Sequence, residues 1–253
     1  MKRLFLSFVF LLCAINGLSA EWRVSSVRSE ASGTTGVEHR HLDLEDAETG
    51  QSAAIELALF SSASCRLRVI DNGTDESDLA TAMHRAGLVA GVNGGYFDPN
   101  FAPLGLRIID GKPTARLTRG RLMSGVLASN GSVQILRLGE FSRAKKINAA
   151  IQCGPMIVDL GNRVAGLEAT RTARRTFAAV ERGNRAALGF CSGATLAELA
   201  SVLTVRLGDF KVQRALNLDG GSSSAFWFKR KDGSAFSIPE EKTVRDFVGI
   251  LAR

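Results

Sequence analysis

Residues 215–228, ALNLDGGSSSAFWF, place one acid, two glycines and three serines between two apolar runs. The apolar alternation over 215–218 predicts a buried strand, which would deliver Asp219 to a strand end where a carboxylate can reach a substrate. Paired glycines permit a sharp turn with N–H groups close to a ligand, and the hydroxyls that follow suit an oxyanion. These predicted substrate-binding residues are Gly220, Gly221, Ser222 and Ser223. An ordinary β-turn capped by its own aspartate is the simpler alternative.

A second apolar strand runs directly into Asn93 and another pair of glycines, which repeats the same pattern. Asn93 is expected to hydrogen-bond the substrate or Asp219, while Gly94 and Gly95 allow the backbone to approach closely. Tyr96 is the only tyrosine of the chain. It can stack on a sugar ring or donate its hydroxyl, and half-buried packing is the alternative.

Two adjacent arginines, Arg174 and Arg175, precede Thr176 in the most basic part of the sequence. A guanidinium group can hold phosphate oxygens in a planar fork, and the threonine hydroxyl can support that contact. Successive side chains of a strand point to opposite faces, so only one of these arginines is expected to face a pocket. The sequence does not say which one. A solvated strand with surface ion pairs is the alternative interpretation.

Four short motifs occur together in a particular order and spacing. They are NGGYF at 93–97, QCGPMIV at 152–158, RRT at 174–176 and LDGGSS at 218–223. In combination they closely resemble the phosphodiester glycosidase family, whose bacterial members are often labelled exopolysaccharide-related, and the resemblance runs from about residue 88 to the end of the chain. It implies that Cys153, Gly154 and Pro155 line the substrate pocket. Two departures fall there: Cys153 replaces a small residue, and Ser222 stands where a third glycine is common.

The resemblance implies hydrolysis of a sugar that is joined through its anomeric oxygen to a phosphodiester, in a glycan or glycolipid-type substrate. Chemistry at an anomeric carbon normally uses two carboxylates. Here the leaving group is a phosphate monoester, whose second pKa is about 6, so it needs little protonation. Asp219 is therefore expected to act as base or nucleophile, or to orient water or a sugar hydroxyl, while arginine stabilises the leaving group. Asp98 is a weaker candidate for a second acid.

Other chemistries find less support. A nucleophile at Ser222, Ser223 or Cys153 lacks a histidine in any of the motifs, and no Gly-x-Ser-x-Gly turn is present. We expect no cofactor and assign no metal site, although a divalent cation held by Asp219 and Asn93 stays open, because hard oxygen ligands suit calcium or magnesium. A non-catalytic glycan- or phosphoglycan-binding module, periplasmic or at the cell surface, is the alternative to an enzyme.

The N-terminal residues have the pattern of a secretory signal peptide. Lys2 and Arg3 precede an apolar run over 4–15, and small residues end at Ala20. We therefore expect a signal peptide over 1–20, export to the periplasm or the medium, and no membrane-spanning segment after its removal.

Three cysteines remain after this segment, an odd number without metal-ligand spacing. They are Cys65, Cys153 and Cys191. Buried thiols are expected, with a Cys153–Cys191 disulfide as the alternative.

The formal charge of +7 favours an anionic partner such as a phosphorylated carbohydrate. Nucleic acid is not expected, because the basic residues do not alternate with stacking aromatics and no nucleic-acid-binding motif is present. The oligomeric state stays open.

The remaining sequence predicts many short strands and few helices. The alternation over 39–44 predicts a strand with His39 and His41 on one face, and an exposed face is favoured over a metal site because no third ligand is near. Helices are expected from residue 74 to about 86 and from 195 onward, where a capping box begins the second helix.

Asp-Gly, Asn-Gly and Gly-Asn pairs predict antiparallel hairpins through the middle of the chain. We expect a single α+β domain over 21–253, with a mixed, largely antiparallel sheet flanked by a few helices.

Overall fold

The computed structural model describes residues 22–73, 76–142 and 146–253, so the expected signal peptide over 1–20 lies outside the described residues. Strands account for 48% of the structure and helices for 8%, and the three sheets are antiparallel. The expected α+β class with a mixed sheet is therefore wrong, and the fold is mostly β. The physical reason is that short turns join most strands. Short turns connect antiparallel neighbours, whereas parallel strands need a long crossover, usually a helix.

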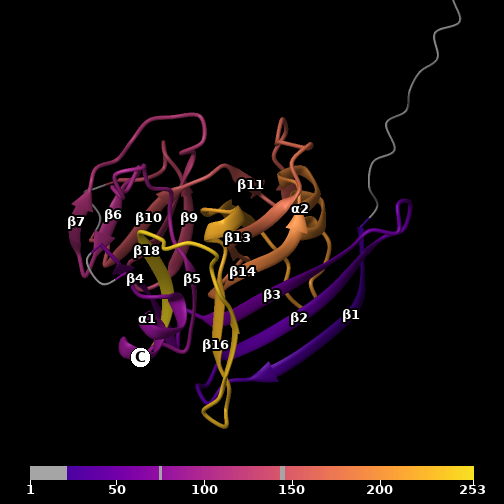
Figure 1. Ribbon diagram of the computed structural model, residues 1–253, viewed down its shortest axis with the longest axis horizontal. Helices are drawn as coiled ribbons and strands as arrows, with labels where there is room; N and C mark the ends of the chain where they lie inside the picture. Colours follow the sequence, from indigo (N-terminus) through magenta and orange to yellow (C-terminus); the bar gives the residue numbers. More distant parts are fainter. Residues whose placement is uncertain (1–21, 74–75, 143–145) are drawn as a thin grey trace, which may run out of the picture.

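The largest sheet has eight strands in the order β1-β2-β3-β14-β13-β15-β11-β12. Their bounds are β1 (Trp22–Ala31), β2 (Val37–Asp46), β3 (Ser52–Ser61), β11 (Met156–Asp159), β12 (Asn162–Arg163), β13 (Ala173–Val180), β14 (Arg185–Ala194) and β15 (Arg214–Asn217). Figure 1 shows β1, β2 and β3 side by side as long strands along one flank of the molecule.

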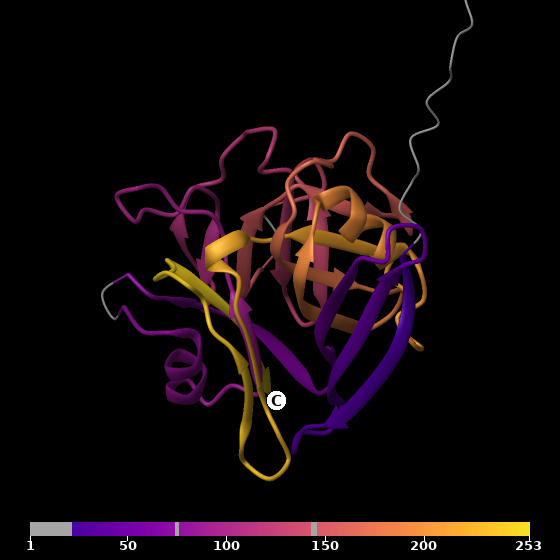
Figure 2. The same cartoon turned by 45° about the vertical axis from the view of Figure 1, so that its right-hand side comes forward.

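The other two sheets have five strands each, in the orders β7-β6-β10-β8-β9 and β17-β16-β5-β18-β4. The strands of the first are β6 (Arg107–Ile109), β7 (Lys112–Ala115), β8 (Gly125–Ser129), β9 (Val133–Arg137) and β10 (Ala149–Cys153). The strands of the second are β4 (Cys65–Asp71), β5 (Ala90–Asn93), β16 (Phe226–Lys229), β17 (Ala235–Ile238) and β18 (Asp246–Ala252). The β16–β17 hairpin extends beside the N-terminal strands, as Figure 2 shows.

The described residues contain two α-helices, α1 (Leu79–Arg85) and α2 (Leu196–Thr204), and a short 3-10 turn, η1 (Gly221–Ser223). α2 begins with the predicted capping box, in which Thr195 and Glu198 each accept the other's backbone N–H. α1 is capped by Asp78, and the expected earlier start at 74–75 lies outside the described residues. In the part of the chain that is described, no helix is long and apolar enough to span a membrane.

The main apolar core lies where the three sheets meet. Phe60 of β3, Leu216 of β15, Ile151 of β10, Phe226 of β16 and Val248 of β18 are all buried in it. Aromatic residues bury the most apolar area per side chain, so the two phenylalanines anchor the sheets to one another. The packing fixes the relative positions of the strand ends that carry the sequence motifs.

A row of acids and histidines lies on β1, β2 and β3. His39 is 5% exposed and Glu56 4% exposed, so the expected exposed strand face is wrong for His39. His39 Nδ1 lies 2.9 Å from Glu30 Oε1 and its Nε2 lies 2.7 Å from Glu56 Oε2. His41 Nδ1 lies 2.7 Å from Glu56 Oε1 and its Nε2 lies 2.9 Å from Asp43 Oδ1. Glu56 therefore joins the two histidine rings, one at each of its carboxyl oxygens.

His41 is expected to make the stability of the fold pH-dependent. Burial disfavours its charged form, but hydrogen bonds to Asp43 and Glu56 outweigh burial and raise the pKa of His41 above its usual value. A raised histidine pKa stabilises the folded state fully below the unfolded-state pKa of about 6.5, and this contribution is lost as pH rises through the folded-state pKa. We therefore expect the urea midpoint of unfolding to fall between about pH 6 and about pH 8, and to fall less in a His41→Gln variant.

His84 is the matched control, because it is exposed on α1. His84→Gln should keep the wild-type dependence of the urea midpoint on pH. An unchanged dependence in His41→Gln would contradict the assignment of this dependence to His41.

Candidate active site

One strand from each sheet ends at the same place in the molecule. β5 ends at Asn93, β10 ends at Cys153 and β15 ends at Asn217. Asn93 Nδ2 donates to the Asp219 backbone oxygen at 2.7 Å, and Asn217 Nδ2 donates to the Gly154 oxygen at 3.0 Å. The structure thus brings together three motifs that lie far apart in the sequence.

Asp219 lies in the loop between β15 and η1. Its backbone N–H donates to the Gly94 oxygen at 3.0 Å, and its Oδ1 accepts the Gly220 N–H at 3.0 Å. Burial raises the pKa of the Asp219 carboxyl, and the Ser223 hydroxyl, the Lys242 charge and the Gly220 N–H act in the opposite direction. A carboxylate with a raised pKa is a stronger base than an exposed aspartate, which suits proton abstraction from water or a sugar hydroxyl.

Asn93 is fully buried and holds three segments together. Its Oδ1 accepts the Thr176 hydroxyl at 2.6 Å and the Ala225 N–H at 3.1 Å, while its Nδ2 donates to the Asp219 backbone. An amide oxygen has two lone pairs, and protein donors use both. Asn93 therefore positions the Asp219 loop and is not oriented to contact a ligand through this oxygen. Thr176, expected to support an arginine, instead supports Asn93.

No group of three or more histidine, cysteine, aspartate or glutamate residues in the described ranges is arranged to hold a metal ion. The absence of a cofactor stays a prediction.

Asp246, an acid for which the sequence predicts no role, supports the glycine turn after β5. It begins β18 and is 2% exposed. Its Oδ1 accepts the Gly95 N–H at 2.8 Å, its backbone oxygen accepts the Gly94 N–H at 2.9 Å, and Arg107 Nη1 lies 3.4 Å from its Oδ2. Burial raises the pKa of Asp246 to about 6, although the Gly95 N–H and Arg107 lower it. The sequence signal that could have identified Asp246 is an acid at the start of an apolar strand.

Tyr96 closes the site on the side of β10. Its hydroxyl donates to the Gly154 oxygen at 2.6 Å and accepts from Asn217 Nδ2 at 3.0 Å. Burial raises the pKa of Tyr96, so the hydroxyl keeps its proton and remains a donor. The Tyr96 hydroxyl therefore forms its hydrogen bonds with protein groups, and the ring packs on the main core.

Gly154 is required where it lies, between Cys153 and the cis peptide bond to Pro155. Its φ is +155°, and a Cβ there would lie 2.1 Å from the Leu122 oxygen. The Pro155 oxygen accepts the Asn217 N–H at 3.1 Å, which joins this segment to β15. These contacts agree with a role for the segment in shaping the site.

The three cysteines are free and buried, which confirms the expectation of buried thiols over a disulfide. They are Cys65, Cys153 and Cys191. Burial also raises the pKa of the Cys153 thiol, so Cys153 is protonated and is unsuited to act as a nucleophile.

Arg174 lies beside the Asp219 loop, and its Nη1 and Nη2 donate to protein oxygens. Nη1 pairs with Glu241 Oε1 at 2.7 Å, and Nη2 donates to the backbone oxygens of Ser224 and Pro239. The guanidinium carbon lies 5.2 Å from the centroid of the Phe190 ring. Arg174 therefore fastens the segment after β17 to the segment after η1.

Arg175 is buried, whereas Arg174 is partly exposed, and the β13–β14 register is irregular between Ala173 and Arg175. Its Nε donates to the Ala194 oxygen at 2.8 Å, and its Nη2 donates to the Arg171 oxygen and lies 3.4 Å from Glu168 Oε2. A Cβ on Gly220 would lie 4.0 Å from Arg175 Nη1, so the guanidinium also borders the glycine turn. Burial lowers the pKa of Arg175 while Glu168 opposes this shift, and an arginine remains charged.

The serines after the paired glycines lie in η1. Gly221 begins this turn with a φ of +64°, a conformation that glycine adopts without strain. Ser223 is fully buried beside Asp219, whereas Ser222 is partly exposed and its backbone oxygen accepts the Glu241 N–H at 2.8 Å. The serines therefore shape the loop and the carboxylate environment.

Gln152, the first residue of the QCGP motif, received no role from the sequence. Its Oε1 accepts the N–H groups of Leu106 and Thr118, both at 3.0 Å. Its Nε2 donates to the oxygens of Thr118 at 2.6 Å and Met123 at 3.0 Å. One buried amide thus holds both ends of the loop that packs against Gly154.

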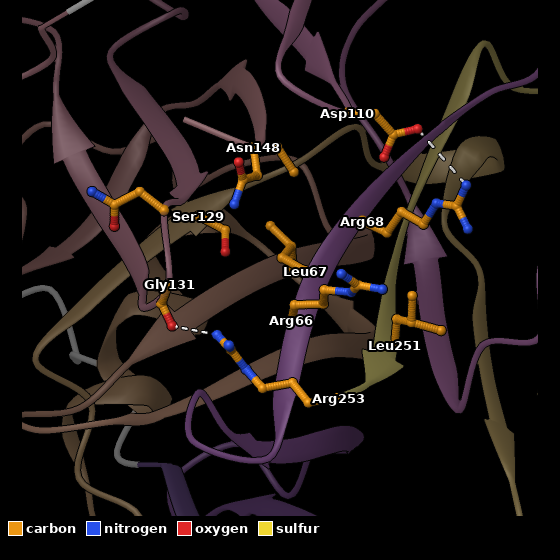
Figure 3. A pocket seen from close by; sticks show the side chains of 11 residues that line it. Arg66, Leu67, Arg68, Asp110, Ser129, Gly131, Asn148, Leu251 and Arg253 are labelled. Carbon is orange, nitrogen blue, oxygen red and sulfur yellow. Dashed lines mark hydrogen bonds and ion pairs between the residues drawn. The ribbon is translucent and has the colours of Figure 1, made fainter. Parts of the chain in front are cut away.

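A separate pocket of about 470 Å³ lies at the other end of β10, since Ala149 lines it while Cys153 ends this strand at the candidate site. Figure 3 shows the side chains of Arg66, Arg68 and Arg253 around it. None of the predicted catalytic or substrate-binding residues lines this pocket, so it is distinct from the Asp219 loop.

Comparison with known proteins settles the family. Residues 86–251 match the family described as phosphodiester glycosidase. The chain belongs to this family. The match confirms the resemblance carried by the four motifs, and the strands β1 to β4 and the helix α1 lie before it.

A curated relative, the uncharacterized protein YigE of Escherichia coli K12, is 34% identical over 97 residues, covering 35% of this chain and 38% of that protein. The alignment thus spans about two fifths of the relative's length.

Two solved structures share the fold. The catalytic domain of zebrafish N-acetylglucosamine-1-phosphodiester α-N-acetylglucosaminidase, auto-inhibited by its pro-peptide, has a TM-score of 0.69 at 17% identity, over 93% of this chain and 89% of that chain. A hypothetical protein from Synechocystis has a TM-score of 0.63 at 14% identity, over 86% of this chain and 62% of that chain. At these identities the likeness shows the fold alone.

Proposed function

We propose that this member of the phosphodiester glycosidase family is an exported hydrolase that cleaves a sugar 1-phosphodiester in a glycan or glycolipid-type substrate. The observation that carries the proposal is the placement of Asp219. Its loop is held by Asn93 from β5 and by Gly94, and it borders Arg174 and Arg175 of β13. The name of the zebrafish protein describes a 1-phosphodiester glycosidase, which supports the same class of substrate here.

Asp219 is assigned the role of base or nucleophile. As a base, it takes a proton from the water whose oxygen bonds to the anomeric carbon. The bond from that carbon to the phosphate oxygen breaks, and its electron pair leaves with the phosphate monoester. This leaving group is stable as an anion near neutral pH, because its second pKa is about 6. One buried carboxylate and nearby cations are then sufficient, without a second acid.

Export to the periplasm or the medium is part of the proposal, and it rests on the sequence pattern of residues 1–20. An extracellular or periplasmic location would give the enzyme access to exopolysaccharide and other phosphorylated glycans.

The test is incubation with a sugar 1-phosphodiester that carries p-nitrophenol as the second ester. Cleavage at the anomeric carbon releases free sugar and p-nitrophenyl phosphate, and water enriched in heavy oxygen labels the sugar. Cleavage at phosphorus would release p-nitrophenol and sugar phosphate, and would overturn the proposed reaction. Binding without any release would favour the glycan-binding module.

A further inference from the structure

The segment between β17 and β18 covers the serine turn of the candidate site. The Glu241 N–H donates to the Ser222 oxygen at 2.8 Å, and the Glu241 carboxylate pairs with Arg174 at 2.7 Å. Glu240 Oε1 accepts the Leu79 N–H at 2.9 Å, which ties the same segment to α1. These contacts fix the backbone on the N-terminal side of Lys242.

Lys242 extends from this segment toward the other glycine motif. Its Nζ lies 5.1 Å from the centroid of the Phe97 ring, and Phe97 follows Tyr96 in the segment after β5. An ammonium group over an aromatic face is held by the negative face of the ring, so the position is a defined one. The Lys242 charge also reaches Asp219, where it lowers the pKa of the carboxyl.

The cations near Asp219 differ in how their donors are used. Protein oxygens accept from Nη1 and Nη2 of Arg174 and from Nε and Nη2 of Arg175. Lys242 is exposed, and it forms no ion pair with the residues that the structure describes. An ammonium has three donors and forms charge-assisted hydrogen bonds with phosphate oxygens. Of these three cations, Lys242 is the exposed one, so its charge and donors can be reached by a ligand from solvent.

We propose that Lys242 binds the phosphate group of the substrate, and that Arg174 and Arg175 hold the protein segments that form the site through their hydrogen bonds to protein oxygens. This inference rests on the proposed function, because it assigns the contact to the phosphate of the scissile diester. The phosphate would lie between Asp219 and the Lys242 ammonium, on the side of Phe97. Lys242 is then a specificity-determining residue, because it favours a charged leaving group over a neutral one.

The experiment compares Lys242→Met, which keeps an unbranched apolar side chain one atom shorter and removes the charge, with Lys231→Met at an exposed lysine in the β16–β17 hairpin. Binding of inorganic phosphate is measured by calorimetry, and kcat and KM are measured with the sugar phosphodiester. Loss of a charged hydrogen bond is expected to weaken phosphate binding and raise KM about 10- to 100-fold in Lys242→Met. Lys231→Met should match the wild type, and Lys242→Arg should recover part of the affinity.

The pH profile separates ligand binding from a structural role. Removal of the Lys242 charge should raise the pKa of Asp219, so the acidic limb of kcat/KM should move to higher pH. Unchanged phosphate affinity in Lys242→Met, or no phosphate binding by the wild type, would overturn the inference about Lys242. Release of free sugar by the wild type in that case would leave the proposed function standing. Failure of sugar release with normal, Lys242-dependent phosphate binding would instead count against the proposed reaction alone.

Discussion

An Asp219→Asn variant should lose turnover of the sugar phosphodiester by a factor on the order of 10² to 10⁴, the range for removal of a general base. The amide keeps the shape of the side chain and can still accept the Gly220 N–H that Asp219 Oδ1 accepts at 3.0 Å. It cannot take a proton from water or attack the anomeric carbon. The fold should persist, because burial already disfavours the charged carboxylate and raises the pKa of Asp219.

The measurement is kcat from initial rates of free-sugar release, together with urea unfolding of the same preparation. Asp110→Asn is a matched control: Asp110 is exposed in the turn between β6 and β7, with a φ of +47°, where asparagine is well tolerated. This control should keep full activity. Turnover by Asp219→Asn within a few-fold of the wild type would remove Asp219 from the chemistry.

The location of the candidate site could be predicted from the sequence, because strand ends followed by paired glycines mark places where backbone approaches backbone or ligand. Gly94 and Asp219 illustrate this: the two motifs lie far apart in the sequence, and the Asp219 N–H donates to the Gly94 oxygen at 3.0 Å. The family could also be predicted, because the four motifs occur together in one chain in the order and spacing that the family shows.

The partners of the polar side chains could not be predicted. Arg175 has the chemistry of a phosphate ligand, yet the Ala194 oxygen accepts from its Nε at 2.8 Å. A backbone oxygen that becomes an acceptor carries no sequence signal, because every residue has one. His39 and His41 share one strand, as the sequence predicts, but their shared acid, Glu56, comes from the neighbouring strand β3. Cross-strand register, which places such a partner, depends on the packed sheet.

The predicted fold class is wrong for a related reason. Hairpin turns in the middle of the chain were predicted, and they are present as β8–β9 and β13–β14. The α+β prediction overestimates the helices, because α1 and α2 are short and lie against sheets that carry the core. Sequence periodicity identifies each element but does not say how many sheets the strands form.

A Gly94→Ala variant should destabilise the protein by about 1–3 kcal/mol, the range for an added methyl group in a packed core, and should also lower activity. A Cβ on Gly94 would lie 2.0 Å from Asp246 Oδ1 and 3.0 Å from the Asp246 backbone oxygen. Asp246 cannot move aside freely, since it is 2% exposed, accepts the Gly95 N–H at 2.8 Å and pairs with Arg107 at 3.4 Å.

The glycine turn must therefore shift in Gly94→Ala, and with it the Gly94 oxygen that accepts the Asp219 N–H at 3.0 Å. The urea midpoint and kcat should fall together, because one displacement causes both. Gly139→Ala is the control, since a Cβ there would meet nothing within 4 Å, and its free energy of unfolding should stay within about 1 kcal/mol of the wild-type value. If Gly94→Ala unfolds at the wild-type urea concentration with wild-type kcat, then Asp246 does not hold the turn, and the link from β18 through Gly94 to Asp219 is absent.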